Sequence, residues 1–178
     1  MEILNPTIAD PPAKGMLAPR LESLDGKVVG YIHGYGGDRI PKRIDELLSA
    51  RYRIAGRLWY RKEYIGEPVS RQVRDQFVSE CDVIVTTLGG GGSCTSALAA
   101  DCLHFQSRGK PVAGFAVDSL SRTVGRALLR AYGFPDYPLI EIPAPFFEST
   151  APTDEEFERK IALAVDAAVN VLRTGLAT

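Results

Sequence analysis

Several features that would assign a protein to a specialised class are scarce in this sequence. Three cysteines, two histidines and one tryptophan occur in 178 residues. Because the cysteines and histidines lack the spacing of a metal-binding motif, we expect no metal site and no disulfide framework. No apolar run approaches the ~18 residues that a membrane span requires. Basic and acidic side chains number 21 and 22, and without a basic excess nucleic acid is disfavoured as a partner.

The first 20 residues have no apolar segment of the kind found in an export signal. We therefore expect a cytoplasmic protein whose thiols are reduced. Four prolines interrupt this stretch, and proline fixes φ and removes an amide donor. Residues 1–26 are accordingly predicted to form an irregular arm. The remaining residues, 27–178, have a length that suits a single α/β domain.

What the sequence does contain is a regular alternation of strand and helix patterns. The segments between the strands carry apolar residues at helical spacing. Such alternation predicts a mostly parallel sheet with helices on both faces, a three-layer α/β sandwich. Short loops and right-handed crossovers favour the strand order 2-1-3-4-5. The five expected strands are residues 27–33, 53–60, 82–88, 111–117 and 138–142.

Glycine-rich loops follow the first and third expected strands, at residues 33–39 and 89–96. In a 2-1-3-4-5 sheet both loops lie where the strand order reverses, which is where ligands bind. Consecutive glycines let the backbone approach a ligand, and the N–H groups of the following helix can bind an anion. The alternative is a tight turn with a Ser or Thr helix cap. The predicted anion-binding residues of the two loops are Gly36, Gly90, Gly91, Gly92, Ser93, Thr95 and Ser96.

Neither loop has the spacing of an ATP-binding loop or of a dinucleotide-binding fingerprint, so we expect no cofactor. Weaker candidates for anion binding come from outside the loops. Arg20 belongs to the arm, while Ser119 and Arg122 follow the fourth expected strand. Arginine pairs well with a carboxylate, although helix capping explains Ser119 equally well.

Cys94 is the principal catalytic candidate, because a helix N-terminus stabilises a thiolate. The alternative is a buried, inert cysteine, which is the interpretation favoured for Cys81 and Cys102. His33 ends the first expected strand and could transfer a proton. Asp101 lies two turns after Cys94 on the same face of the helix. It could orient a partner group, bridge to another loop, or be solvated.

The residues around Cys94 resemble the UGSC-like family, which is named for a selenocysteine-Gly-Ser-Cys motif. The family's selenocysteine or cysteine position falls on Gly91, and its Gly, Ser, Cys, Thr and Ser fall on residues 92–96. A selenol–thiol or dithiol centre needs two chalcogens, and only Cys94 remains here. The resemblance is carried by residues 81–85, 91–96 and Asp101, with the N-terminal segments 4–7, 17–20 and 25–29.

The loop is also similar to the cysteine loops of aspartate/glutamate racemase-type enzymes. Those enzymes place two cysteines from pseudo-symmetric halves on either side of the substrate carbon. This sequence contains no second glycine-rich loop with a thiol, which argues against a two-base racemase.

Three functions follow from these observations. The favoured one is a metal-independent cysteine enzyme of the isomerase, lyase or transferase type, in which Cys94 is nucleophile or base. Its substrate would be a small anionic metabolite with a carboxylate or carbonyl group. The alternatives are single-thiol redox chemistry and a non-catalytic anion-binding subunit. We expect the chain to form a homo-oligomer or to pair with a related subunit.

Overall fold

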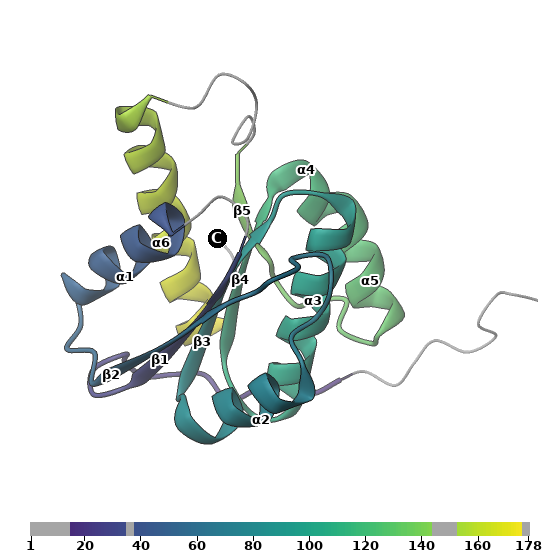
Figure 1. Ribbon diagram of the computed structural model, residues 1–178, viewed down its shortest axis with the longest axis horizontal. Coiled ribbons are helices and arrows are strands. Elements are labelled where there is room, and N and C mark those ends of the chain that lie inside the picture. The colour runs from purple at the N-terminus through teal and green to yellow at the C-terminus, as the bar shows by residue number, and fades with distance from the viewer. Residues whose placement is uncertain (1–14, 35–37, 144–152, 176–178) are drawn as a thin grey trace, which may run out of the picture.

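The computed structural model describes residues 15–34, 38–143 and 153–175. Its centre is a five-stranded sheet with the order β2-β1-β3-β4-β5, and every neighbouring pair is parallel. The predicted sheet and strand order are therefore confirmed (Figure 1). The strands are β1 Val28–His33, β2 Gly56–Arg61, β3 Val83–Gly89, β4 Val112–Val117 and β5 Ile140–Ile142.

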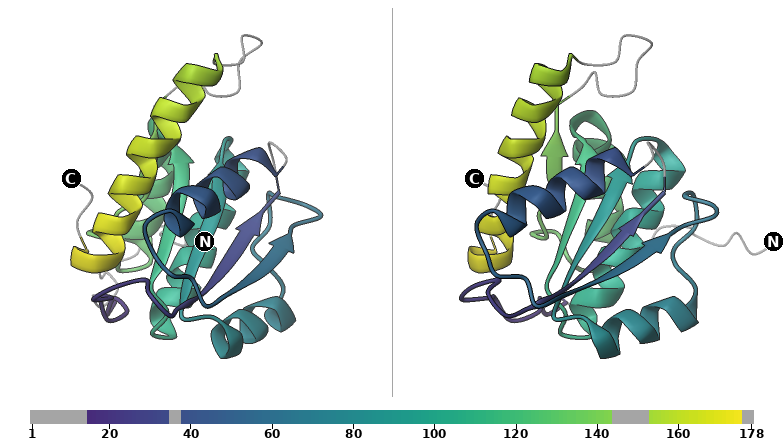
Figure 2. Two further views of the ribbon diagram at one scale, coloured as in Figure 1. Left: turned by 90° about the vertical axis from the view of Figure 1, so that its left-hand side faces the viewer. Right: turned by 60° about the vertical axis from the view of Figure 1, so that its left-hand side comes forward.

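Helices cover both faces of the sheet. Figures 1 and 2 show α1 and α6 on one face, with α2, α3 and α5 on the other. The helix expected after the fourth strand is one continuous helical segment, in which a π-helical stretch η1 separates α4 from α5. The helical elements are α1 Arg39–Ser49, α2 Arg71–Glu80, α3 Gly92–Ser107, α4 Asp118–Leu120, η1 Ser121–Gly125, α5 Arg126–Ala131 and α6 Asp154–Thr174.

The core forms two apolar layers, one on each side of the sheet. Side chains alternate between the faces of a strand, so Val85 of β3 packs toward α1 and α6 while Ile84 packs toward α2 and α3. Every residue of β3 is buried, as its β-branched and apolar sequence predicts for a central parallel strand. The edge strand β2 instead alternates half-buried and exposed residues.

The helix ends follow local sequence signals. The hydroxyl of Thr153 accepts a hydrogen bond from the backbone N–H of Glu156 at 3.2 Å, so Thr153 caps α6. Ser70 caps α2 in the same way by accepting from the N–H of Val73. Gly109 follows α3 with a φ of +74°, a conformation that favours glycine. None of the described helices is both long and apolar enough to cross a membrane.

Residues 15–27 contain no helix or strand, but they pack closely on the domain. Leu24 is fully buried in the layer beneath α1 and α6. The N–H of Ala18 donates to the side-chain carbonyl of Gln106 at 2.7 Å, near the end of α3. The N–H of Leu21 donates to the carbonyl of Leu172, near the end of α6. This segment therefore joins two helices at the edge of the sheet where the strands begin.

Candidate functional site

The loop between β3 and α3 presents the beginning of a helix at the carboxyl edge of the sheet. Gly91 is the N-cap residue of α3, and its backbone is extended, with φ −149° and ψ 171°. Its carbonyl accepts the N–H of Thr95 at 2.9 Å. The N–H groups of the first helical turn have no partner within the helix, and that turn carries no acidic residue. The loop therefore has the donors and the dipole that an anion requires.

The glycines of this loop differ in what surrounds them. A Cβ at Gly89 would lie 2.8 Å from the Thr95 hydroxyl and 3.1 Å from the Cβ of Ala116, so packing requires glycine there. A Cβ at Gly91 would meet only the Cys94 sulfur, at 3.8 Å, and a Cβ at Gly92 would meet nothing within 4 Å. The last two glycines thus leave open space beside the thiol.

Cys94 is the third residue of α3 and is partly exposed, whereas Cys81 and Cys102 are buried. Burial raises the pKa of the Cys81 thiol to about 11 and that of the Cys102 thiol to about 12. Each lies against a strand glycine, since a Cβ at Gly30 would be 2.7 Å from the Cys81 sulfur and one at Gly114 would be 2.4 Å from the Cys102 sulfur. Both are structural thiols, as the sequence suggested, and both are poor nucleophiles at neutral pH.

The hydroxyl groups of the loop do not all face the same way. Thr95 is fully buried beside Gly89, and its hydroxyl has no hydrogen-bond partner among the described residues. The Ser96 hydroxyl donates to the Gly92 carbonyl at 3.0 Å, so it is engaged within the helix. Ser93 is exposed beside the open glycines. Of the predicted anion-binding residues, Gly91, Gly92 and Ser93 border the open side, Gly90 is half-buried, and Gly36 lies outside the described residues.

Asp101 is completely buried and uses both carboxylate oxygens. The ammonium of Lys62 donates to Oδ2 at 2.7 Å, and the N–H of Val69 donates to Oδ1 at 2.9 Å. Burial raises the pKa of the Asp101 carboxyl, and the Lys62 ammonium opposes that rise. Asp101 is seven positions after Cys94 in the helix, a rise of about 10 Å. Asp101 therefore bridges α3 to the segment after β2 and is not positioned to contact the thiol.

Lys62 is the residue of this region that the sequence did not single out. Its side chain is almost fully buried against Asp101. Its backbone N–H donates to the carbonyl of His33 at 2.8 Å. The ion pair thereby links α3 to the carboxyl ends of both β1 and β2.

His33 lies on the side of the sheet that faces α1. Tyr31, two residues earlier and so on the same face, donates its hydroxyl to Asp45 of α1. The His33 side chain is 7% exposed, and burial lowers its pKa from 6.5. No hydrogen bond or ion pair connects His33 with Cys94 or Asp101 within the described ranges. The two candidate catalytic residues nearest the strand ends therefore lie on opposite faces of the sheet.

The weaker anion-binding candidates already have partners. Arg122 binds Glu141 of β5 through Nε at 3.0 Å and Nη2 at 2.7 Å. The N–H of Ser119 donates to the carboxylate of Asp118. Arg20 lies at the C-terminal end of α6, within 3.5 Å of the Val171 carbonyl, at the edge of the sheet opposite the cysteine loop. Sequence position alone did not show these partners.

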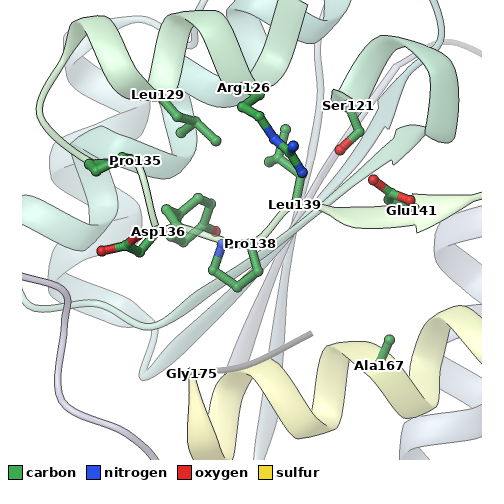
Figure 3. Close-up of a pocket in the computed structure, with 11 residues that line it drawn as sticks. Ser121, Arg126, Leu129, Pro135, Asp136, Pro138, Leu139, Glu141, Ala167 and Gly175 are labelled. Atoms are coloured by element: carbon green, nitrogen blue, oxygen red, sulfur yellow. The ribbon is translucent and has the colours of Figure 1, made fainter. Parts of the chain in front are cut away.

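A separate concavity of about 480 Å³ runs along the free side of β5 between α5 and α6. Figure 3 shows the side chain of Arg126 extending from α5 toward Leu139, with Ala167 on the facing helix. Glu141, which pairs with Arg122, is part of its wall. No residue of the 89–96 loop lines it, so the two regions are distinct.

The fold and the loop define a doubly wound α/β protein with an accessible cysteine in the first turn after a central strand. The sequence model of the UGSC family matches residues 2–174, and the chain belongs to that family. The family resemblance seen in the sequence is thus confirmed. No curated protein and no solved structure matches the chain.

Proposed function

We propose that the protein is a cysteine-dependent enzyme that acts on a small anionic metabolite, with Cys94 as the thiolate nucleophile or base. One observation carries this proposal. Of the three thiols, only Cys94 is accessible, and it lies in the first turn of α3 beside the space left by Gly91 and Gly92. A helix N-terminus stabilises a thiolate over a thiol.

The loop supports chemistry at a carbonyl group or beside a carboxylate. The thiolate would add to an electrophilic carbon or remove a proton from a carbon next to the carboxylate. The N–H groups of the first turn would hold the substrate carboxylate or the oxyanion that develops. With Gly91 at the position of the family's second chalcogen, the reaction does not rely on exchange between two sulfur or selenium atoms. It belongs to the isomerase, lyase or transferase class.

Asp101 and Lys62 serve this site as positioning residues. Their ion pair fixes α3 against the segment that follows β2. A buried ion pair of this kind, placed behind the reactive residues, holds a reactive group in a productive orientation without touching the substrate.

The first test is the rate of iodoacetamide labelling at each cysteine in the native protein, measured by peptide mass spectrometry. Cys94 should label much faster than Cys81 and Cys102, because it alone is accessible and lies at a helix N-terminus. Labelling of Cys94 no faster than a cysteine in an unstructured peptide would contradict an activated thiol. Where Cys94 labels rapidly, Cys94→Ser should abolish turnover in a screen of small carboxylates and carbonyl compounds while the fold is retained.

A non-catalytic anion-binding subunit is the second candidate, and Gly91 is the observation that favours it. Such a subunit would use the same N–H groups and would pair with a related chain that supplies the reactive residue. Anion binding that survives Cys94→Ser, without turnover by either protein, would support this alternative.

A further inference from the structure

A further pocket, of about 380 Å³, lies at the carboxyl ends of β1 and β2. It is on the α1 face of the sheet, as the position of His33 shows, whereas Cys94 belongs to α3 on the other face. The residues that line it are His33, Asp38, Lys42, Trp59 and Arg61. None of them belongs to the 89–96 loop.

His33 provides the first sign of a ligand in this pocket. The residue is only 6% exposed, yet its Nδ1 atom has no hydrogen-bond partner among the described residues. The Oδ1 atom of Asp38 lies 3.6 Å from this nitrogen, which is too long for a hydrogen bond. A buried polar atom without a partner is costly and uncommon in folded proteins. A ligand atom would satisfy it.

The charges around the pocket favour an anion. Arg61 has no hydrogen-bond or ion-pair partner in the described parts of the chain. Lys42 lies 3.4 Å from the single carboxylate, Asp38. Asp38 precedes α1 but its side chain does not cap it, so the positive end of the α1 dipole adds to the two cations. Two arginines of α1 and one of β2, by contrast, are paired with carboxylates. Arg39 pairs with Asp154, Arg43 with Glu158 and Arg57 with Asp45.

Trp59 supplies a flat apolar wall. Its indole is stacked on Tyr31 with ring centroids 4.2 Å apart and planes 15° apart, and it meets His33 edge-on at 6.1 Å and 81°. These contacts hold the ring in one orientation, while the residue stays 39% exposed. A held aromatic ring beside unpaired positive charge suits a ligand that is both planar and anionic.

We propose that this pocket binds a small organic anion that carries a flat unsaturated ring. The ring packs on Trp59, and the anionic group lies between Arg61 and Lys42. A polar atom of the ligand forms a hydrogen bond with Nδ1 of His33. This site goes beyond the chemistry proposed for Cys94 and does not depend on it.

The single tryptophan makes the proposal directly testable, because Trp59 fluorescence reports on this pocket alone. Benzoate is the probe, since it combines a ring with a carboxylate. Acetate has the charge without the ring, and benzamide has the ring without the charge. Benzoate should change the emission saturably, and at much lower concentration than either comparator.

Variants then locate the binding site. Arg61→Gln and Lys42→Gln should each weaken benzoate binding roughly ten-fold, the effect of losing one charge-assisted contact. Arg126→Gln makes the same charge change in the concavity beside β5 and should leave binding unchanged. Cys94→Ser should also leave it unchanged, so failure of this proposal is distinguishable from failure of the proposed enzyme.

A second readout does not use fluorescence. Benzoate should raise the thermal unfolding midpoint of the wild type and of Arg126→Gln, and should do so far less for Arg61→Gln. The proposal is overturned if benzoate has no saturable effect, or if Arg61→Gln and Arg126→Gln bind it equally. Equal binding of acetate and benzoate would overturn the role given to Trp59.

Discussion

Replacing Asp101 by asparagine should destabilise the fold severely, because it leaves a buried ammonium without a counter-charge. The Asp101 side chain is fully buried and that of Lys62 is 6% exposed, with their charged atoms 2.7 Å apart. Breaking a buried ion pair by removing one partner typically costs about 3–5 kcal/mol. A domain of ordinary stability has only about 5–15 kcal/mol, so Asp101→Asn should lose a large fraction of it.

Urea unfolding followed by circular dichroism measures this loss as a shift of the midpoint at constant slope. The matched control is Asp75→Asn, which breaks the exposed ion pair of Asp75 with Arg71 and should cost less than about 1 kcal/mol. The double variant Asp101→Asn with Lys62→Met removes both charges, so it should recover much of the stability that Asp101→Asn loses.

Two results would refute this reasoning. One is an Asp101→Asn variant that unfolds at the same urea concentration as Asp75→Asn. The other is a double variant that is less stable than Asp101→Asn alone, since an uncompensated Lys62 would then not be the cause of the loss.

Three further predictions concern the two loops. Gly91→Cys should form an intramolecular disulfide with Cys94 on mild oxidation, because the new Cβ lies 3.8 Å from the Cys94 sulfur. Gly92→Cys should not form one. Equal loss of free thiols in the two variants would contradict the position of Gly91 beside Cys94. Gly89→Ala should lower the free energy of unfolding in urea by about 1–3 kcal/mol, because the new methyl group overpacks against Thr95. A loss no greater than that of Gly92→Ala would contradict this prediction. Burial lowers the pKa of His33 below 6.5, so the unfolded chain binds its proton more readily and stability is lost as the pH falls below 6.5. His33→Gln should reduce that loss in acid titrations of the unfolding free energy, and an unchanged pH dependence would count against a buried neutral imidazole.

The order of the sheet and the place of the cysteine loop followed from the sequence alone. Strand and helix periodicities are local, and the handedness of crossovers leaves few ways to connect five parallel strands. The β-branched and apolar residues at 83–88 indicated a strand buried on both faces. A cysteine placed directly after that strand and its glycines has to lie at the carboxyl edge of the sheet.

Which side chains share that edge was decided only by the tertiary structure. Asp101 and Lys62 are 39 residues apart, and no local pattern pairs them, because their contact depends on how α3 packs against the segment that follows β2. The same holds for Arg20, which packing places at the far edge of the sheet, and for His33, whose strand register turns it toward α1 and Trp59. The local sequence determines which segments form helices and strands and which of their faces are apolar. The partners of a side chain depend instead on how elements that are distant in the sequence pack against one another.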